Sequence, residues 1–273
     1  MNMITLRSGH SIPQLGLGTW ELTGPTCTAS VEHAIEMGYR HIDTAFGYRN
    51  HSDVASGIRQ SGISRDELFV TTKIPLNQQT RQAVLDHGAR LQDELGMEYV
   101  DLLLIHWPDR NVEFEETFGA MDELVKSGVA RSIGISNFNA ELVAEADAVS
   151  RSPIVTNQVE FHPFLNQKSL QKVCEDRGIT ITAYSPLARG NVVADPRLQE
   201  IGRQYDVGPA QVAVAWLLSK GFIVIPKASS ETHLRSNLSA TSLEISDDHI
   251  AEIDSFGDHR RFVDWPGKHY PLE

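Results

Sequence analysis

Residues 100–136 of the chain read VDLLLIHWPDRNVEFEETFGAMDELVKSGVARSIGIS. The apolar run from Val100 to His106, bounded by Pro108, predicts a buried strand. The next apolar side chains recur at helical spacing until Gly128, and they are Phe114, Phe118, Met121 and Val125. A second apolar run, Ser132 to Ser136, predicts another strand. This order is typical of two parallel neighbours in one sheet, because parallel strands need a long crossover connection.

The same alternation continues on both sides of this unit. Six further runs are expected to form strands, at residues 15–18, 41–43, 68–73, 154–159, 179–184 and 222–225. Helical patterns lie between and after them, at residues 31–38, 52–61, 84–95, 141–149, 170–178, 211–219, 233–238 and 247–253. Leu6 and Ile12 flank the turn signal Ser8-Gly9-His10, which predicts a small N-terminal β-hairpin.

Eight strands alternating with helices predict an α/β fold of the (β/α)₈ TIM barrel type, with extra C-terminal helices. The length of 273 residues fits, since such a barrel takes about 250, and we expect one domain over residues 1–273. The competing layout is an open doubly wound sheet, which binds dinucleotides with a glycine-rich turn after its first strand. Residues 16–21 lack the third glycine of that fingerprint, so the barrel is favoured.

The formal net charge of −12 disfavours anionic partners, so we expect no binding to nucleic acid or to membrane surfaces. The N-terminus lacks the apolar core of a signal peptide, and no apolar stretch is long enough to cross a bilayer. Two distant cysteines, Cys27 and Cys174, fit reduced thiols packed as small apolar side chains. We therefore expect a cytoplasmic protein. We also expect it to be a monomer, although the sequence itself does not give the oligomeric state.

Polar or ionisable residues stand at or just beyond the ends of seven predicted strands. They are Asp43, Lys73, His106, Ser136, Asn137, Gln158, Tyr184, Ser185 and Lys227. The active site of such a barrel lies at the carboxyl ends of its strands, so the sequence predicts one site there. No His-x-His pair or His/Asp cluster has the spacing of metal ligands, so we expect no metal.

Asp43 and Lys73 end adjacent predicted strands, and each would be costly to bury alone, so we expect them to form an ion pair. Tyr48 follows in the loop over the barrel mouth. A phenol has a pKa near 10, and the ammonium of Lys73 is expected to lower that pKa by stabilising the phenolate. His106, beside Trp107, could donate as a neutral imidazole to a carbonyl oxygen. The plainer alternative is a packed histidine with satisfied hydrogen bonds.

Several short motifs, in the family's order and spacing, resemble the aldo-keto reductase superfamily over residues 12–237. They are Gly38 to Ala45 with Tyr48, Thr71 to Lys73, Leu104 to Pro108, Gly134 to Phe138, Asn157-Gln158, Ala183 to Leu187, and Ile225 to Lys227. The short loops are most similar to bacterial 2,5-diketo-D-gluconate and methylglyoxal reductases. The resemblance implies NADPH-dependent reduction of small dicarbonyl compounds, sugar-type aldehydes or simple aldehydes to alcohols.

The resemblance also implies roles for individual residues. The catalytic set would be Asp43, Tyr48, Lys73 and His106, with Tyr48 as the proton donor. Ser136, Asn137 and Gln158 would hold the nicotinamide carboxamide, and Tyr184 would stack on its ring. The other implied cofactor residues are Thr19, Asp43, Ser185, Pro186, Leu187, Arg189, Pro226, Lys227, Ala228, Ser229, His233 and Asn237. The implied substrate walls are Trp20, Phe46 and Trp107. Trp265 of the short tail could reach over the mouth or pack against the side of the barrel.

Lys227 is suited to the 2′-phosphate of NADPH, so we expect NADPH to be preferred over NADH. Relatives usually carry a serine and, further on, an arginine where this chain has Ala228 and His233, although Arg235 could compensate. Because arginine grips phosphate bidentately, we expect weaker discrimination against NADH than in the family at large.

Two other functions stay open. A Schiff-base aldolase on the same barrel would use Lys73 as its nucleophile. A relative that binds the cofactor only as a regulatory or structural protein would need no catalysis, although the intact catalytic set favours an enzyme.

Overall fold

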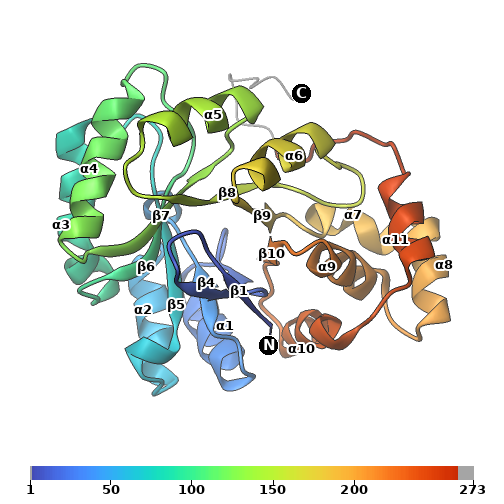
Figure 1. Ribbon diagram of the computed structural model, residues 1–273. Coiled ribbons are helices and arrows are strands. Elements are labelled where there is room, and N and C mark those ends of the chain that lie inside the picture. The colour runs from blue at the N-terminus through green and yellow to red at the C-terminus, as the bar shows by residue number, and fades with distance from the viewer. Residues whose placement is uncertain (1, 264–273) are drawn as a thin grey trace.

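The N-terminal hairpin forms where the turn signal predicts it. The structure, a computed structural model, describes residues 2–263. Strand β1 (Met3–Thr5) pairs antiparallel with β2 (Ser11–Pro13), and Gly9 between them has a φ of 86°, a conformation that suits glycine. Leu6 and Ile12 are buried in a cluster with apolar side chains inside the sheet. The hairpin therefore lies across the barrel, as Figure 1 shows.

All eight predicted parallel strands are present, and they follow one another around the sheet in chain order. They are β3 (Leu17–Gly18), β4 (His41–Asp43), β5 (Phe69–Ile74), β6 (Val100–Ile105), β7 (Ala130–Ser136), β8 (Ile154–Glu160), β9 (Thr180–Tyr184) and β10 (Ile223–Val224). Every neighbouring pair is parallel.

Main-chain hydrogen bonds close the sheet into a barrel. The amide of Gly16 donates to the oxygen of Val224 at 2.9 Å, and the amide of Val224 donates to Gln14 at 2.8 Å. Gly18 and Lys227 form a further parallel bridge. The first and last strands are thus joined, which confirms the (β/α)₈ barrel.

Helices cover the outside of the barrel. Those that follow β3 to β8 in turn are α1 (Gly24–Glu36), α2 (His51–Gln60), α3 (Arg81–Leu95), α4 (Phe114–Lys126), α5 (Ala140–Val149) and α6 (Lys168–Asp176). Those that follow β9 and β10 are α7 (Asn191–Ala194), α8 (Pro196–Gln204), α9 (Pro209–Ser219), α10 (Glu231–Ser239) and α11 (Asp247–Asp254). Residues 2–263 also form four short 3₁₀ turns, η1 (Phe46–Tyr48), η2 (Arg65–Glu67), η3 (Ala188–Gly190) and η4 (Ala240–Ser242).

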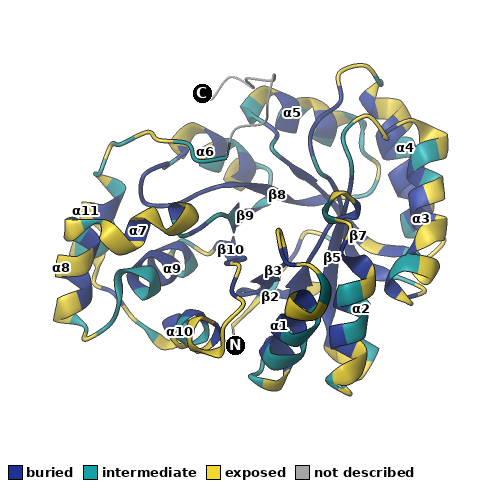
Figure 2. Ribbon diagram, turned by 180° about the vertical axis from the view of Figure 1, so that it is seen from behind, coloured by how far each residue is buried: buried dark blue, intermediate teal, exposed yellow. Residues whose placement is uncertain are grey.

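The strands are buried on both faces, which explains their nearly continuous apolar sequence. One apolar cluster fills the barrel interior, and a larger one lies between the sheet and the helices. Figure 2 shows the result, with dark strands at the centre and exposed outer faces on the helices. Sequence reasoning missed α7 and α8, although Asp195 before Pro196 is a helix-start signal, and its carboxylate does cap α8.

Three findings concern the expectations about membrane spans, cysteines and metal sites. Within residues 2–263, no helix combines the length and the apolar character needed to cross a membrane. Cys27 and Cys174 are buried and form no disulfide. In the same part of the chain, no group of three or more His, Cys, Asp or Glu side chains could hold a metal ion.

Candidate active site

Asp43, Lys73 and Tyr48 meet at the carboxyl end of the barrel. The Nζ of Lys73 donates to Oδ1 of Asp43 at 2.6 Å and to the main-chain oxygen of Thr44 at 2.7 Å. It lies 3.3 Å from the hydroxyl of Tyr48. The other carboxylate oxygen of Asp43 accepts a hydrogen bond from Nε2 of Gln158 at 2.8 Å. The predicted ion pair is therefore confirmed, and the phenol lies beside it.

A short turn fixes Tyr48 above this pair. Tyr48 ends η1, and Arg49 then reverses the chain with a φ of 57°. The buried side chain of Asn50 accepts a hydrogen bond from Oγ1 of Thr44 and donates one to the main-chain oxygen of Thr19, both at 2.9 Å. These bonds tie the turn to the ends of β3 and β4, so the phenol has a defined position.

The ring of Phe46 packs against two histidines of the outer helices. Its ring centroid lies 4.6 Å from that of His51 and 4.3 Å from that of His87, on α2 and α3. These contacts do not support the expectation that Phe46 forms a wall of the substrate pocket. Its ring fills the space between the turn and the outer helices, where burial of an aromatic side chain is favourable.

Burial governs the ionisation of the catalytic candidates. It raises the pKa of Asp43 and lowers that of Lys73, while the attraction between the two opposes both shifts. Burial also raises the pKa of Tyr48 well above its ordinary value, and the charge of Asp43 adds to this. The expected lowering of the pKa of Tyr48 is therefore wrong, because burial raises this pKa and the charge of Asp43 raises it as well. Tyr48 stays a protonated phenol at neutral pH, the form that a proton donor requires.

His106 follows β6 at the same end of the barrel. Its ring centroid lies 5.5 Å from that of Tyr48, with the two planes at 76°. Burial and, to a smaller extent, the charge of Lys73 together lower the pKa of His106 to about 3. The imidazole is therefore neutral at physiological pH, with one nitrogen able to donate and the other able to accept.

Uncharged polar groups form a second cluster beside His106. The hydroxyl of Ser136 donates to the main-chain oxygen of Gln158 at 2.8 Å, and Nδ2 of Asn137 donates to that of His106 at 2.9 Å. The hydroxyl of Tyr184 donates to Oδ1 of Asn137 at 2.8 Å. Amide and hydroxyl groups beside an aromatic ring are a donor set that fits a carboxamide on a flat heterocycle.

The loop after β9 carries four of the residues assigned to the cofactor, namely Ser185, Pro186, Leu187 and Arg189. Ser185 and Arg189 have φ values of 47° and 50°, which are unusual for side-chain-bearing residues. The guanidinium of Arg189 lies 5.2 Å from the ring centroid of Trp20, which is 43% exposed. This loop thus reaches toward the end of β3, where Oγ1 of Thr19 donates to the main-chain oxygen of Asp43 at 2.9 Å.

The residues assigned to the adenine end lie on the loop between β10 and α10 and on that helix. They are Pro226, Lys227, Ala228, Ser229, His233 and Asn237. Lys227 is exposed, whereas Asn237 is buried. Arg235 is also exposed, and its guanidinium lies 3.8 Å from the carboxylate of Glu231. The two cationic side chains that could meet a 2′-phosphate are therefore both accessible.

Sequence reasoning missed Glu160, the last residue of β8. Its fully buried carboxylate accepts hydrogen bonds from the main-chain amides of Phe262 at 2.7 Å and Val263 at 3.2 Å. No local pattern signals a contact between segments 102 positions apart. Trp107 is buried as a pocket wall could be, whereas Trp265 lies outside the described residues.

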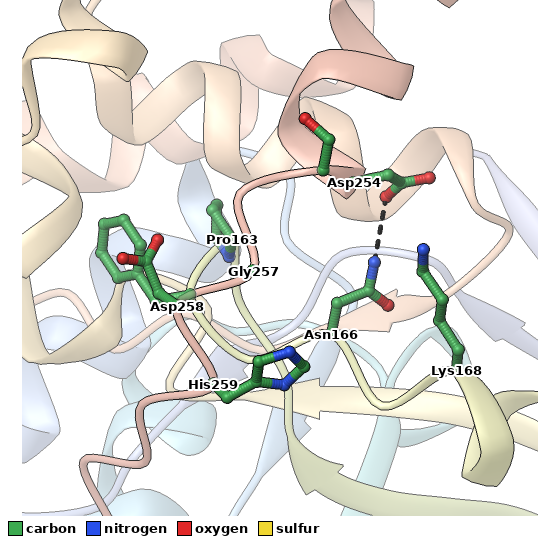
Figure 3. A pocket seen from close by; sticks show the side chains of 9 residues that line it. Pro163, Asn166, Lys168, Asp254, Gly257, Asp258 and His259 are labelled. Atoms are coloured by element: carbon green, nitrogen blue, oxygen red, sulfur yellow. Dashed lines mark hydrogen bonds between the residues drawn. The ribbon is translucent and has the colours of Figure 1, made fainter.

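A separate pocket of about 240 Å³ lies between the loop after β8 and the chain that follows α11, as Figure 3 shows. Its lining combines apolar surface with the polar side chains of Asn166, Lys168, Asp254, Asp258 and His259. None of the catalytic candidates lines it, so this pocket is not the expected substrate site.

Comparison with known proteins agrees with this geometry. The sequence matches the profile of the Aldo/keto reductase family over residues 14–258. It is 36% identical to a 9,11-endoperoxide prostaglandin H2 reductase of Trypanosoma cruzi, over 99% of this chain and 96% of the relative. It is also 36% identical to a glyoxal reductase of Bacillus subtilis, over 94% of each chain.

Solved structures show the same fold. An aldo-keto reductase of Bombyx mori in complex with NADP has a TM-score of 0.90 and 32% identity, covering 96% of this chain and 95% of that one. An aldose reductase from Schistosoma japonicum has a TM-score of 0.92 and 29% identity, covering 96% of this chain and 94% of that one.

Proposed function

The chain belongs to the aldo/keto reductase family, and on that premise we propose that it reduces small carbonyl compounds to alcohols with NADPH, using Tyr48 as the proton donor. The observation that carries the proposal is the 3.3 Å contact between the Tyr48 hydroxyl and the Lys73 ammonium, beside a neutral His106. Small dicarbonyl compounds and simple aldehydes are the proposed substrates, in keeping with a relative named glyoxal reductase.

The side chains divide the chemistry between them. His106 donates a hydrogen bond to the carbonyl oxygen and orients it. Tyr48 gives its proton to that oxygen as negative charge develops there. Lys73, held by Asp43, offsets the negative charge that the phenol oxygen acquires. When bound, reduced nicotinamide supplies the hydride.

The cofactor would be held by the uncharged cluster and the two loops. Ser136, Asn137 and Gln158 offer amide and hydroxyl groups to the carboxamide, and Tyr184 offers the flat side of its ring. Trp20 and Trp107 would form the apolar walls that exclude water from the reacting centre.

An aldolase is disfavoured by the surroundings of Lys73. A lysine ammonium has three donors, and here they face Asp43, the main-chain oxygen of Thr44 and the hydroxyl of Tyr48. A Schiff-base nucleophile needs an amine free to attack a carbonyl carbon, and this amine is engaged on every side.

A direct test incubates the purified protein with glyoxal, methylglyoxal, a simple aldehyde and a ketone, with NADPH or NADH, and follows the loss of reduced nicotinamide absorbance. We expect turnover of the aldehydes with NADPH. Tight NADPH binding without turnover of any carbonyl would instead support a non-catalytic, cofactor-binding role.

Preference for NADPH should depend on Lys227. Replacing Lys227 by alanine is expected to raise the KM for NADPH about tenfold or more and leave the KM for NADH unchanged, because charge-assisted bonds to phosphate are strong. Arg235→Ala is the matched variant, since it removes a second exposed cation from the same region. An equal rise in both KM values after Lys227→Ala would show that the lysine does not read the phosphate.

A further inference from the structure

The carboxylate of Glu160 is covered by the C-terminal segment, residues 261–263. Both of its oxygens contact the main-chain amide of Val263 at 3.2 Å, and one also accepts from the amide of Phe262 at 2.7 Å. The guanidinium of Arg261 lies 3.6 Å away, and Nε2 of His162 lies 3.1 Å away. Three of these four partners belong to the C-terminal segment.

Such an arrangement specifies where the segment docks. A buried carboxylate is costly unless hydrogen-bond donors and positive charge surround it. Two successive main-chain amides donate to one carboxylate, and this arrangement fixes the position of the segment that carries them. The ring of Phe262 adds contacts with the rings of His162 at 5.4 Å and Phe164 at 6.4 Å.

The chain before this segment has attachments of its own. The main-chain amide of Arg260 donates to the main-chain oxygen of Phe164 at 2.8 Å, and the carboxylate of Asp258 pairs with Arg197 at 2.8 Å. The rest of this chain borders the pocket of about 240 Å³ beside the loop after β8 (Figure 3). The bonds to Glu160 are therefore a separate attachment, which holds residues 261–263 themselves.

Glu160 also lies next to the proposed nicotinamide site. It is in register with Tyr184 on β9, and it follows Gln158 by two positions on β8. Alternate residues of a strand face the same side, so Glu160 and Gln158, which contacts Asp43, face the same side of the sheet. Residues 261–263 are thus fixed near Tyr184, on whose ring the nicotinamide would stack.

We propose that Glu160 is a positioning residue for substrate binding, because its carboxylate fixes residues 261–263 at the rim of the mouth, where they complete the substrate site. This proposal rests on the carbonyl reductase function proposed above. The carboxylate of Glu160 bonds to residues 261–263 and His162 rather than to Tyr48 or Lys73, so its loss should weaken substrate binding and spare the chemical step.

The test compares Glu160→Gln with the native chain. Glutamine keeps the shape of the side chain but has no charge. Its NH₂ group would face the main-chain amides of Phe262 and Val263, which are themselves donors. We expect the amides of Phe262 and Val263 to exchange hydrogen at least about tenfold faster, since bonds to a charged acceptor are the stronger kind. We also expect the KM for methylglyoxal to rise about tenfold, with kcat within about twofold and unchanged affinity for NADPH.

Two further variants sharpen the result. Glu145→Gln removes one carboxylate from an exposed pair with Arg110 and should change neither readout. Val263→Pro removes an amide donor from the segment side and leaves the barrel untouched, so it should raise the KM as Glu160→Gln does.

The outcomes separate the two proposals. Unchanged amide exchange in Glu160→Gln, or faster exchange with an unchanged KM, would overturn the role of Glu160. If the native chain reduces no carbonyl compound, the proposed function fails, and the exchange measurement still decides whether Glu160 holds the segment.

Discussion

Replacing Tyr48 by phenylalanine is expected to lower kcat for carbonyl reduction by about 10² to 10⁴-fold, the usual contribution of a positioned acid. Phenylalanine keeps the ring and its contact with His106 but removes the one hydroxyl that faces Lys73 at 3.3 Å. The affinity for NADPH, measured by the fluorescence of the reduced nicotinamide, should be nearly unchanged. A loss of less than tenfold would mean that another group or water donates the proton.

The pH dependence of the native chain adds a second check on the same phenol. Because burial raises the pKa of Tyr48, the protonated form persists across the neutral range. Reduction should therefore not decline through ionisation of Tyr48 until strongly alkaline pH. Alcohol oxidation needs the phenolate as a base, so its rate should rise with pH over the same range. Tyr48→Phe should remove that rise.

The barrel was predictable because each strand can be recognised from the apolar run of its own residues. Apolar runs such as Val100 to Ile105 are buried on both faces, so their sequence shows no polar alternation. The site followed from one geometric rule, since parallel strands in a barrel end at the same rim. Asp43 and Lys73 could be paired from strand order alone, because β4 and β5 are neighbours in the sheet.

Sequence reasoning missed two kinds of feature: the direction in which a side chain points, and contacts between residues far apart in the sequence. Phe46 and Tyr48 are two residues apart in one turn, yet the ring of Phe46 packs on His51 while the hydroxyl of Tyr48 lies beside Lys73. Spacing in a turn does not fix such directions. The pKa of Tyr48 depends on burial and on the nearby charge of Asp43, and only the fold supplies both. Glu160 meets residues 102 positions away, which no window of sequence contains.

The largest effect on stability is expected from Lys73→Met. Lys73 is fully buried, and its removal leaves the buried carboxylate of Asp43 without a positive partner. Breaking a buried ion pair by removing one partner costs about 3–5 kcal/mol, so the free energy of unfolding in urea should fall by that amount. Activity should also be lost, because no ammonium then offsets the charge on the phenol oxygen of Tyr48.

The double variant Asp43→Asn/Lys73→Met separates these two roles of the ion pair. Asparagine keeps the shape of Asp43 and can still accept the hydrogen bond from Gln158, but it leaves no uncompensated charge in the core. We therefore expect most of the lost stability to return in urea unfolding while carbonyl reduction stays abolished. A double variant that regains activity together with stability would reduce the pair to a structural one, and the chemistry would then rest on Tyr48 and His106 alone.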